Sequence, residues 1–193
     1  FVNVRSVIPT SQIKSDPKQK IDFNKKLVDL NELKIPHNNS KKKLKEILIN
    51  CNTDSLLVMH KGILVFEYFN YFTAYDTPHI IFSISKSLTS LLTGILVDKN
   101  IINLNNLVSD VLPETIGTSY EDATIRNVLD MNVASNFIED YSGKAEIFKK
   151  YRSSTGWDIS SSKNENTLTG LHDFLSNMPK SENPHGKKYH YCS

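Results

Sequence analysis

The sequence predicts an α+β fold, in which an antiparallel sheet is flanked by helices. Two apolar runs, 55–59 and 63–69, are separated by His60-Lys61-Gly62, which is the pattern of a β-hairpin with Gly62 supplying a positive φ. Further along, residues 83–98 carry apolar side chains at helical spacing, and several shorter helical patterns follow. Strands followed by a block of helices indicate an α+β architecture rather than alternating β–α–β units.

Two regions are expected along the chain. Residues 1–45 are polar and rich in Lys and Asn, which predicts an irregular arm lying over the domain. Residues 46–193 are expected to form the main domain, with the hairpin at 54–70 and a helical part at 83–180. At the junction, Ser40 is predicted to cap a short helix over 40–50.

The helical part is expected to begin with its longest helix, over 83–98, whose apolar face is formed by Ile84, Leu88, Leu91, Leu92 and Ile95. Shorter helices are predicted at 107–112, 123–131, 145–151 and 167–178, and the serines at 160–162 indicate a surface loop. A two-stranded hairpin is not a stable sheet by itself. We therefore expect further strands to come from sequence that follows Ser193.

Charge and composition argue against several classes of partner. Lys and Arg number 23 against 21 Asp and Glu, which is too small an excess to indicate a nucleic-acid partner. The basic run 41–45 is explained by a solvated helix face. Apolar runs are too short for a membrane span. The chain starts at Phe1 without a signal-peptide pattern, so a cytoplasmic location and a periplasmic one after signal removal both stay open.

Cysteine, histidine and glycine patterns do not indicate a cofactor. Cys51 and Cys192 are too few for a disulfide framework, and their pairing is not readable from the sequence. His185, His190 and Cys192 do not have the spacing of a metal site. A glycine-rich phosphate loop is also missing, so we expect neither a metal nor a nucleotide.

The pair Ser83 and Lys86 is the strongest candidate for catalysis. The pattern S-x-x-K occurs at Ser11, Ser15, Ser40, Ser83 and Ser160. Only Ser83 stands between an apolar approach, 80–82, and a long apolar helix. A lysine three residues after a serine lies on the same helix face and can reach its hydroxyl. The alternative is an N-cap serine beside an exposed lysine.

Two requirements follow if Ser83 is a nucleophile. Free N–H groups at the start of a helix favour negative charge, so the backbone N–H of Ser83 is a candidate donor to an oxyanion. A lysine accepts a proton only when it is uncharged, which favours a Lys86 that is shielded from water.

The wider sequence resembles the β-lactamase-related serine hydrolases of the penicillin-recognising fold. The resemblance rests on IFSISKSLTS at 81–90, continues through GILVDKNIINLNNLVSDVLPE, YEDATIRNVLDMNVASNFIEDY and YRSSTGW, and ends with YHYCS. It looks closest to the nylon-oligomer (6-aminohexanoate-dimer) hydrolase branch, which is related to class C β-lactamases. It covers about residues 55 to 193 and implies a β-lactamase/transpeptidase-like fold with a helical subdomain, here incomplete at its C-terminus.

The resemblance also implies roles for individual residues. Ser83 and Lys86 match the S-x-x-K motif, and Tyr191 matches a tyrosine that works with the lysine in proton transfer. Tyr141 and Trp157 match aromatic positions of the substrate cleft, although ordinary packing is the alternative for both. The family's third motif, which supplies a second oxyanion donor, would lie beyond Ser193.

The function implied is a serine hydrolase that cleaves an amide or ester bond of a small molecule through an acyl–Ser83 intermediate, without a cofactor. Its expected partner is the remainder of its own domain. Two alternatives stay open: a penicillin-binding peptidase or β-lactamase, and an inactive ligand-binding module of the same fold.

Overall fold

The computed structural model describes residues 2–8, 10–13, 16–19, 21–157 and 170–192. The chain divides into two compact units, Phe1–Ile80 and Ile81–Ser193. Both strands and helices are present, so the predicted α+β class is confirmed. The predicted loop at 160–162 lies outside the described residues. In the described part of the chain, no helix is long and apolar enough to cross a membrane.

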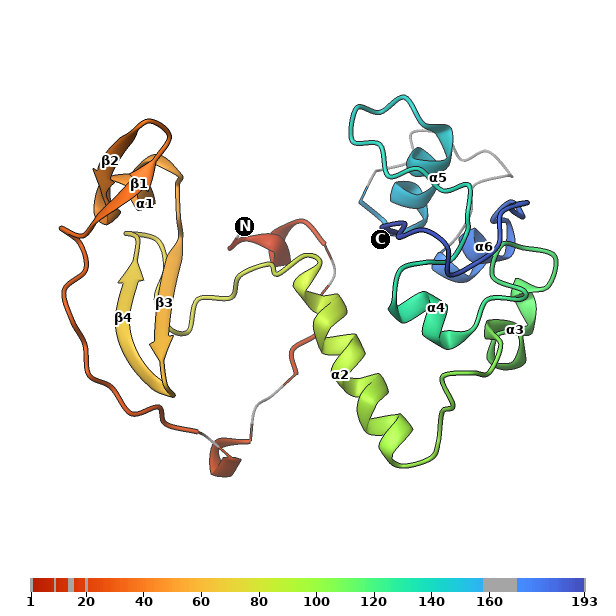
Figure 1. Ribbon diagram of the computed structural model, residues 1–193, viewed down its shortest axis with the longest axis horizontal. Helices are drawn as coiled ribbons and strands as arrows, with labels where there is room; N and C mark the ends of the chain where they lie inside the picture. Colours follow the sequence, from red (N-terminus) through yellow and green to blue (C-terminus); the bar gives the residue numbers. More distant parts are fainter. Residues whose placement is uncertain (1, 9, 14–15, 20, 158–169, 193) are drawn as a thin grey trace. The chain divides into compact units, whose positions relative to one another are not determined.

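The first unit is built on the predicted hairpin, which consists of β3 (Ser55–His60) and β4 (Ile63–Phe69) (Figure 1). The turn between them places both Lys61 (φ 49°) and Gly62 (φ 77°) in the left-handed region. Two consecutive left-handed residues are typical of the type I′ turn, whose twist matches that of the flanking strands. The predicted hairpin is thus confirmed. Its turn uses Gly62, as expected, and also holds Lys61 in a conformation that is unfavourable for a residue other than glycine.

The segment before the hairpin is more regular than expected. β1 (Lys34–His37) pairs antiparallel with β2 (Ser40–Lys43), and α1 (Leu44–Asn50) follows. The prediction that Ser40 caps a helix is therefore wrong, because Ser40 pairs with His37 across a tight turn. Asn38 in that turn adopts a φ of 52°, which asparagine tolerates better than most residues. The basic run accordingly lies largely on a strand rather than on a helix face.

Residues 24–28 of the predicted irregular arm also join the hairpin. Backbone N–H groups of Lys26 and Val28 donate to the carbonyls of Leu64 and Val65 at 2.9 and 2.8 Å. The N–H of Leu64 in turn donates to the carbonyl of Asn24. This part of the arm therefore satisfies hydrogen-bonding groups on the edge of β4. Two short 3-10 turns, Val4–Ser6 and Pro17–Gln19, precede it.

The second unit is helical. Its helices are α2 (Ile84–Asp98), α3 (Val108–Val111), α4 (Ile125–Leu129), α5 (Glu146–Ser154) and α6 (Leu171–Ser176), with a 3-10 turn at Pro113–Thr115. Each lies where the sequence predicts a helix, with the ends shifted by a few residues. Thr124 caps α4 through a reciprocal pair of bonds with Asn127. Residues 167–169 of the last predicted helix lie outside the described part.

The core of this unit is aromatic. Phe137, whose exposed fraction is 0%, contacts the rings of Phe148, Tyr151 and Phe174 edge-on at centroid distances of 5.6–6.1 Å. Helix α5 packs on α6, and Met178 completes this core cluster. By contrast, α2 buries none of its residues, and its predicted apolar face is exposed.

Residues 177–192 follow α6 without forming a helix or strand. They run back along residues 131–137, to which several hydrogen bonds join them. This irregular segment carries Tyr191, and it therefore determines where that side chain lies.

Candidate active site

Ser83 lies at the N-terminal end of α2, directly after a residue in an uncommon conformation. Phe82 has a φ of 41°, in the left-handed region that bulky residues rarely adopt. Ser83 itself has ordinary right-handed angles and makes no side-chain capping bond to the helix. Ser83 therefore occupies the N-cap position without capping the helix through its hydroxyl, which has other partners.

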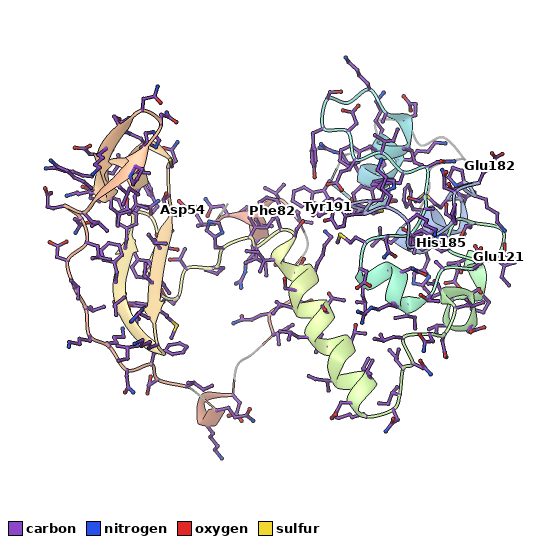
Figure 2. The ribbon with its side chains drawn as sticks, in the orientation of Figure 1. Asp54, Phe82, Glu121, Glu182, His185 and Tyr191 are labelled. Atoms are coloured by element: carbon purple, nitrogen blue, oxygen red, sulfur yellow. The ribbon has the colours of Figure 1, made fainter. Side chains whose placement is uncertain are left out.

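Two other candidate residues from the sequence, Lys86 and Tyr191, meet at the Ser83 hydroxyl. The Nζ of Lys86 donates to its Oγ at 3.2 Å, from one helical turn further along α2. The hydroxyl of Tyr191 is hydrogen-bonded to the same Oγ, and Figure 2 shows Tyr191 beside the start of α2. Lys86 Nζ also lies 5.3 Å from the centre of the Tyr191 ring. The structure thus brings Ser83, Lys86 and Tyr191 together as one group, here called the triad.

The N-terminal end of α2 offers a donor beside the triad. The N–H groups of Ile84, Ser85 and Lys86 already donate to carbonyls within the turn 81–83. Within the described residues, no acceptor is found for the backbone N–H of Ser83. It is therefore available to a negatively charged oxygen that forms next to the Ser83 side chain.

Lys86 is only partly shielded from water. It lines a cavity of about 340 Å³ whose wall includes Tyr120 and Cys192. Burial raises the pKa of both the Tyr120 hydroxyl and the Cys192 thiol, so both stay protonated at neutral pH. The shielding expected for Lys86 is thus incomplete in this structure.

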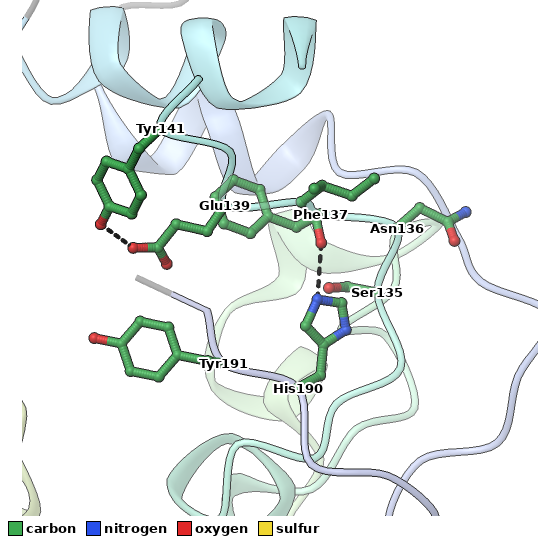
Figure 3. A pocket seen from close by; sticks show the side chains of 8 residues that line it. Ser135, Asn136, Phe137, Glu139, Tyr141, His190 and Tyr191 are labelled. Carbon is green, nitrogen blue, oxygen red and sulfur yellow. Dashed lines mark hydrogen bonds between the residues drawn. The ribbon is translucent and has the colours of Figure 1, made fainter. Parts of the chain in front are cut away.

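A larger, open cavity of about 790 Å³ adjoins the triad through Tyr191. Its lining residues are Ser135, Asn136, Phe137, Ile138, Glu139, Tyr141, His190 and Tyr191 (Figure 3). Tyr141 lies in this wall, and its hydroxyl donates to the Glu139 carboxylate, while its role in substrate binding stays a prediction. The cavity thus offers aromatic surface, one carboxylate and several hydrogen-bonding groups next to Tyr191.

Trp157 lies elsewhere. Its ring stacks on Phe82 with a centroid distance of 6.3 Å and an interplanar angle of 22°, and it is not among the residues that line the larger cavity. Through this contact Trp157 packs against the left-handed residue that precedes Ser83. The structure therefore places Trp157 beside the residue that precedes Ser83, and its role in the substrate cleft stays a prediction.

Several residues around the triad were not found by sequence reasoning. Ser135 and His190 line both cavities, and Glu139 lines the larger one. From the sequence, His190 was considered only as a metal ligand. Its place next to Tyr191 in the sequence was the one available signal. Among the described residues, no group of three or more His, Cys, Asp or Glu side chains is arranged to hold a metal.

Comparison with known proteins identifies the family. The β-lactamase family model matches residues 49–193, which is most of the chain. The chain belongs to the β-lactamase family. The triad lies wholly inside the matched range, and the predicted resemblance to β-lactamase-related serine hydrolases is confirmed.

Two similar proteins illustrate the relationship. The chain is 28% identical over 141 residues to the 6-aminohexanoate-dimer hydrolase of Paenarthrobacter ureafaciens, a match that covers 73% of this chain and 35% of that protein. The solved structure of a Bacillus anthracis protein, provisionally assigned as a 6-aminohexanoate-dimer hydrolase, superposes with a TM-score of 0.86 at 22% identity. That superposition covers 99% of this chain and 50% of the other, and it confirms the β-lactamase-like fold.

Proposed function

We propose that this chain carries the nucleophile and the proton-transfer groups of a serine hydrolase, which cleaves an amide or ester bond through an acyl–Ser83 intermediate. The observation that carries the proposal is the convergence of Lys86 Nζ and the Tyr191 hydroxyl on one oxygen, Ser83 Oγ. A serine hydroxyl is a weak nucleophile unless a neighbouring base removes its proton. The pairing of this hydroxyl with two proton-carrying groups supports such activation.

In the acylation step, Lys86 would act as the base and take the proton of Ser83, directly or through Tyr191. The freed Oγ attacks the substrate carbonyl carbon, and the carbonyl oxygen becomes an oxyanion. The backbone N–H of Ser83 would donate to that oxygen. When the tetrahedral intermediate collapses, the bond from carbon to the leaving nitrogen or oxygen breaks. The leaving group then receives, through Tyr191, the proton that Lys86 took from Ser83.

In the deacylation step, water replaces the leaving group. The same base removes a proton from the water, and the water oxygen attacks the carbonyl carbon of acyl–Ser83. Breaking of the bond to Oγ releases a carboxylic acid, and the proton returns to Ser83. One water molecule is consumed in each cycle, and no redox partner or cofactor is needed.

The proposed substrate is a small molecule with a linear amide or simple ester. The larger cavity is open and adjoins Ser83 through Tyr191, which supports access by an extended chain. The names of the two relatives point to amide-linked dimers of an amino acid. The chain spans 50% and 35% of the lengths of these relatives, so this activity is proposed for the whole protein.

Labelling of the complete gene product with a fluorophosphonate tests the proposal. We expect intact-mass spectrometry to show one adduct on the parent and on Ser87→Ala, and none on Ser83→Ala. Ser87 is the matched control because it is an exposed serine on the same helix. A folded parent that forms no adduct would contradict the proposal and favour an inactive ligand-binding module.

A further inference from the structure

Tyr191 reaches Ser83 from a segment that has no regular secondary structure. Residues 177–192 form neither helix nor strand, so no continuous ladder of backbone bonds fixes their path. The position of the Tyr191 hydroxyl therefore depends on a few individual contacts. Proton transfer tolerates little misplacement, and about 1 Å of displacement can cost roughly 100-fold in rate.

His190, the residue before Tyr191, makes two of these contacts. Its backbone N–H donates to the carbonyl of Met131 at 2.6 Å. Its ring Nε2 lies 2.8 Å from the carbonyl oxygen of Phe137, as Figure 3 shows. A carbonyl oxygen only accepts, so Nε2 carries the hydrogen in this bond. His190 is thus attached to both ends of the segment 131–137.

The acceptor end of this contact is firmly held. The Phe137 side chain is fully buried among the aromatic rings of the core, which fixes the backbone from which its carbonyl projects. On the other side of Tyr191, Cys192 packs against the same core cluster and lies within 3.7 Å of the Tyr120 hydroxyl. His190 and Cys192 therefore anchor the chain on both sides of Tyr191, while the Tyr191 hydroxyl meets Ser83.

We propose that His190 is a positioning residue for Tyr191, and that its ring bond to the Phe137 carbonyl holds the Tyr191 hydroxyl against Ser83 Oγ. The inference rests on the proposed function. His190 touches neither Ser83 nor Lys86 in any recorded hydrogen bond, so it would act only through Tyr191. Its role requires a donor at Nε2, not a change of charge.

Two substitutions separate the hydrogen bond from the volume of the ring. His190→Phe keeps a planar ring but cannot donate, whereas the side-chain amide of His190→Gln can donate to the same carbonyl. In the complete gene product, we expect His190→Phe to lower the rate of Ser83 labelling by a fluorophosphonate about 10- to 100-fold. We expect His190→Gln to recover most of that rate. His172→Phe, an exposed histidine bonded to Glu114, is the matched control and should label like the parent.

A double-mutant cycle tests whether His190 acts through Tyr191. We expect His190→Phe to have no further effect on labelling once Tyr191→Phe is present. Equal losses in both backgrounds would overturn the inference, because they would indicate a general structural effect. A parental labelling rate in His190→Phe with an unchanged melting temperature would also overturn it. If Tyr191→Phe itself labels like the parent, the proposed role of Tyr191 fails, and the inference fails with it.

Discussion

The hydroxyl of Tyr191 is hydrogen-bonded to the Oγ of Ser83, although 108 residues separate the two in the sequence. Lys86 donates to the same oxygen from within α2. One serine oxygen thus faces two groups of different chemistry, an amine on a helix and a phenol on an irregular segment. We therefore expect mutations of Lys86 and of Tyr191 to have separate effects.

Replacing Tyr191 by Phe removes the hydroxyl that meets Ser83 while keeping the ring. We expect the acylation rate, measured by single-turnover kinetics with an ester substrate, to fall about 10²- to 10⁴-fold because proton transfer through the phenol is lost. Tyr71→Phe is the control, since Tyr71 is fully exposed. A parental rate in Tyr191→Phe would contradict a role for this hydroxyl in proton transfer.

Replacing Lys86 by Met removes the amine but keeps an unbranched apolar side chain at the same position. We expect turnover of the ester to fall about 10²- to 10⁴-fold, with little change in far-UV circular dichroism, because Ser83 loses its base. Lys99→Met, just beyond the C-terminal end of α2, should behave as the parent. Substantial turnover in Lys86→Met would identify another base.

Tyr141 is expected to affect substrate binding more than chemistry. It lines the larger cavity, where its hydroxyl donates to the Glu139 carboxylate, so Tyr141→Ala should raise KM several-fold and change kcat less. Tyr141→Phe removes the bond to Glu139 but keeps the ring, and it should have the smaller effect. A fall in kcat with unchanged KM would instead indicate that Tyr141 acts on the reacting groups.

Phe137 is expected to dominate the stability of the helical unit. Its side chain is fully buried against three other rings, so Phe137→Ala should lower the free energy of unfolding by about 3–5 kcal/mol. Ile116→Ala is the control, because Ile116 is mostly exposed and should cost far less. Urea denaturation followed by circular dichroism measures both. Equal losses in the two variants would show that the aromatic cluster is not the core.

The pair His79 and Asp54 predicts how stability depends on pH. The 2.7 Å bond between His79 Nε2 and Asp54 Oδ2 raises the pKa of His79 and lowers the pKa of Asp54. The raised His79 pKa stabilises the fold fully below the unfolded value of about 6.5, and this contribution is lost as pH rises through the folded pKa. The lowered Asp54 pKa stabilises the fold above about pH 4, and this contribution is lost as pH falls through the folded pKa.

The pair therefore contributes most between about pH 4 and 6.5. We expect the melting temperature to decline less steeply from pH 6 to pH 8 in His79→Gln than in the parent, as measured by differential scanning fluorimetry. His60→Gln, on β3, is the control. Parallel melting profiles for parent and His79→Gln would rule out this contribution.

Local patterns were sufficient to predict the hairpin and the long helix. The alternation of β3 and β4 and the helical spacing after Ser83 are properties of short stretches of sequence. The helix-cap prediction for Ser40 was wrong because a serine a few residues before an apolar run is compatible with two structures. It can cap a helix, or it can lie on a strand that leads into a helix, as it does here. The turn at Asn38 decides between these outcomes, and it depends on pairing with β1.

The candidate site was only partly predictable. Ser83 and Lys86 are neighbours in the sequence, whereas Tyr191 was identified by family resemblance alone. Trp157 was assigned to the cleft by the same resemblance, but its stacking on Phe82 depends on tertiary packing that no spacing rule describes. The contact between His190 and Phe137 joins an imidazole to a backbone carbonyl. Because every residue has a backbone carbonyl, such a contact leaves no pattern in the sequence.

The irregular path of residues 177–192 has a consequence for how the protein would lose activity. Segments with few backbone bonds open by local fluctuations that need less free energy than global unfolding. Mild denaturant would then release Tyr191 while the aromatic core around Phe137 stays intact. Inactivation would precede the loss of helical signal, and the amide of His190 would exchange with deuterium faster than amides within α5.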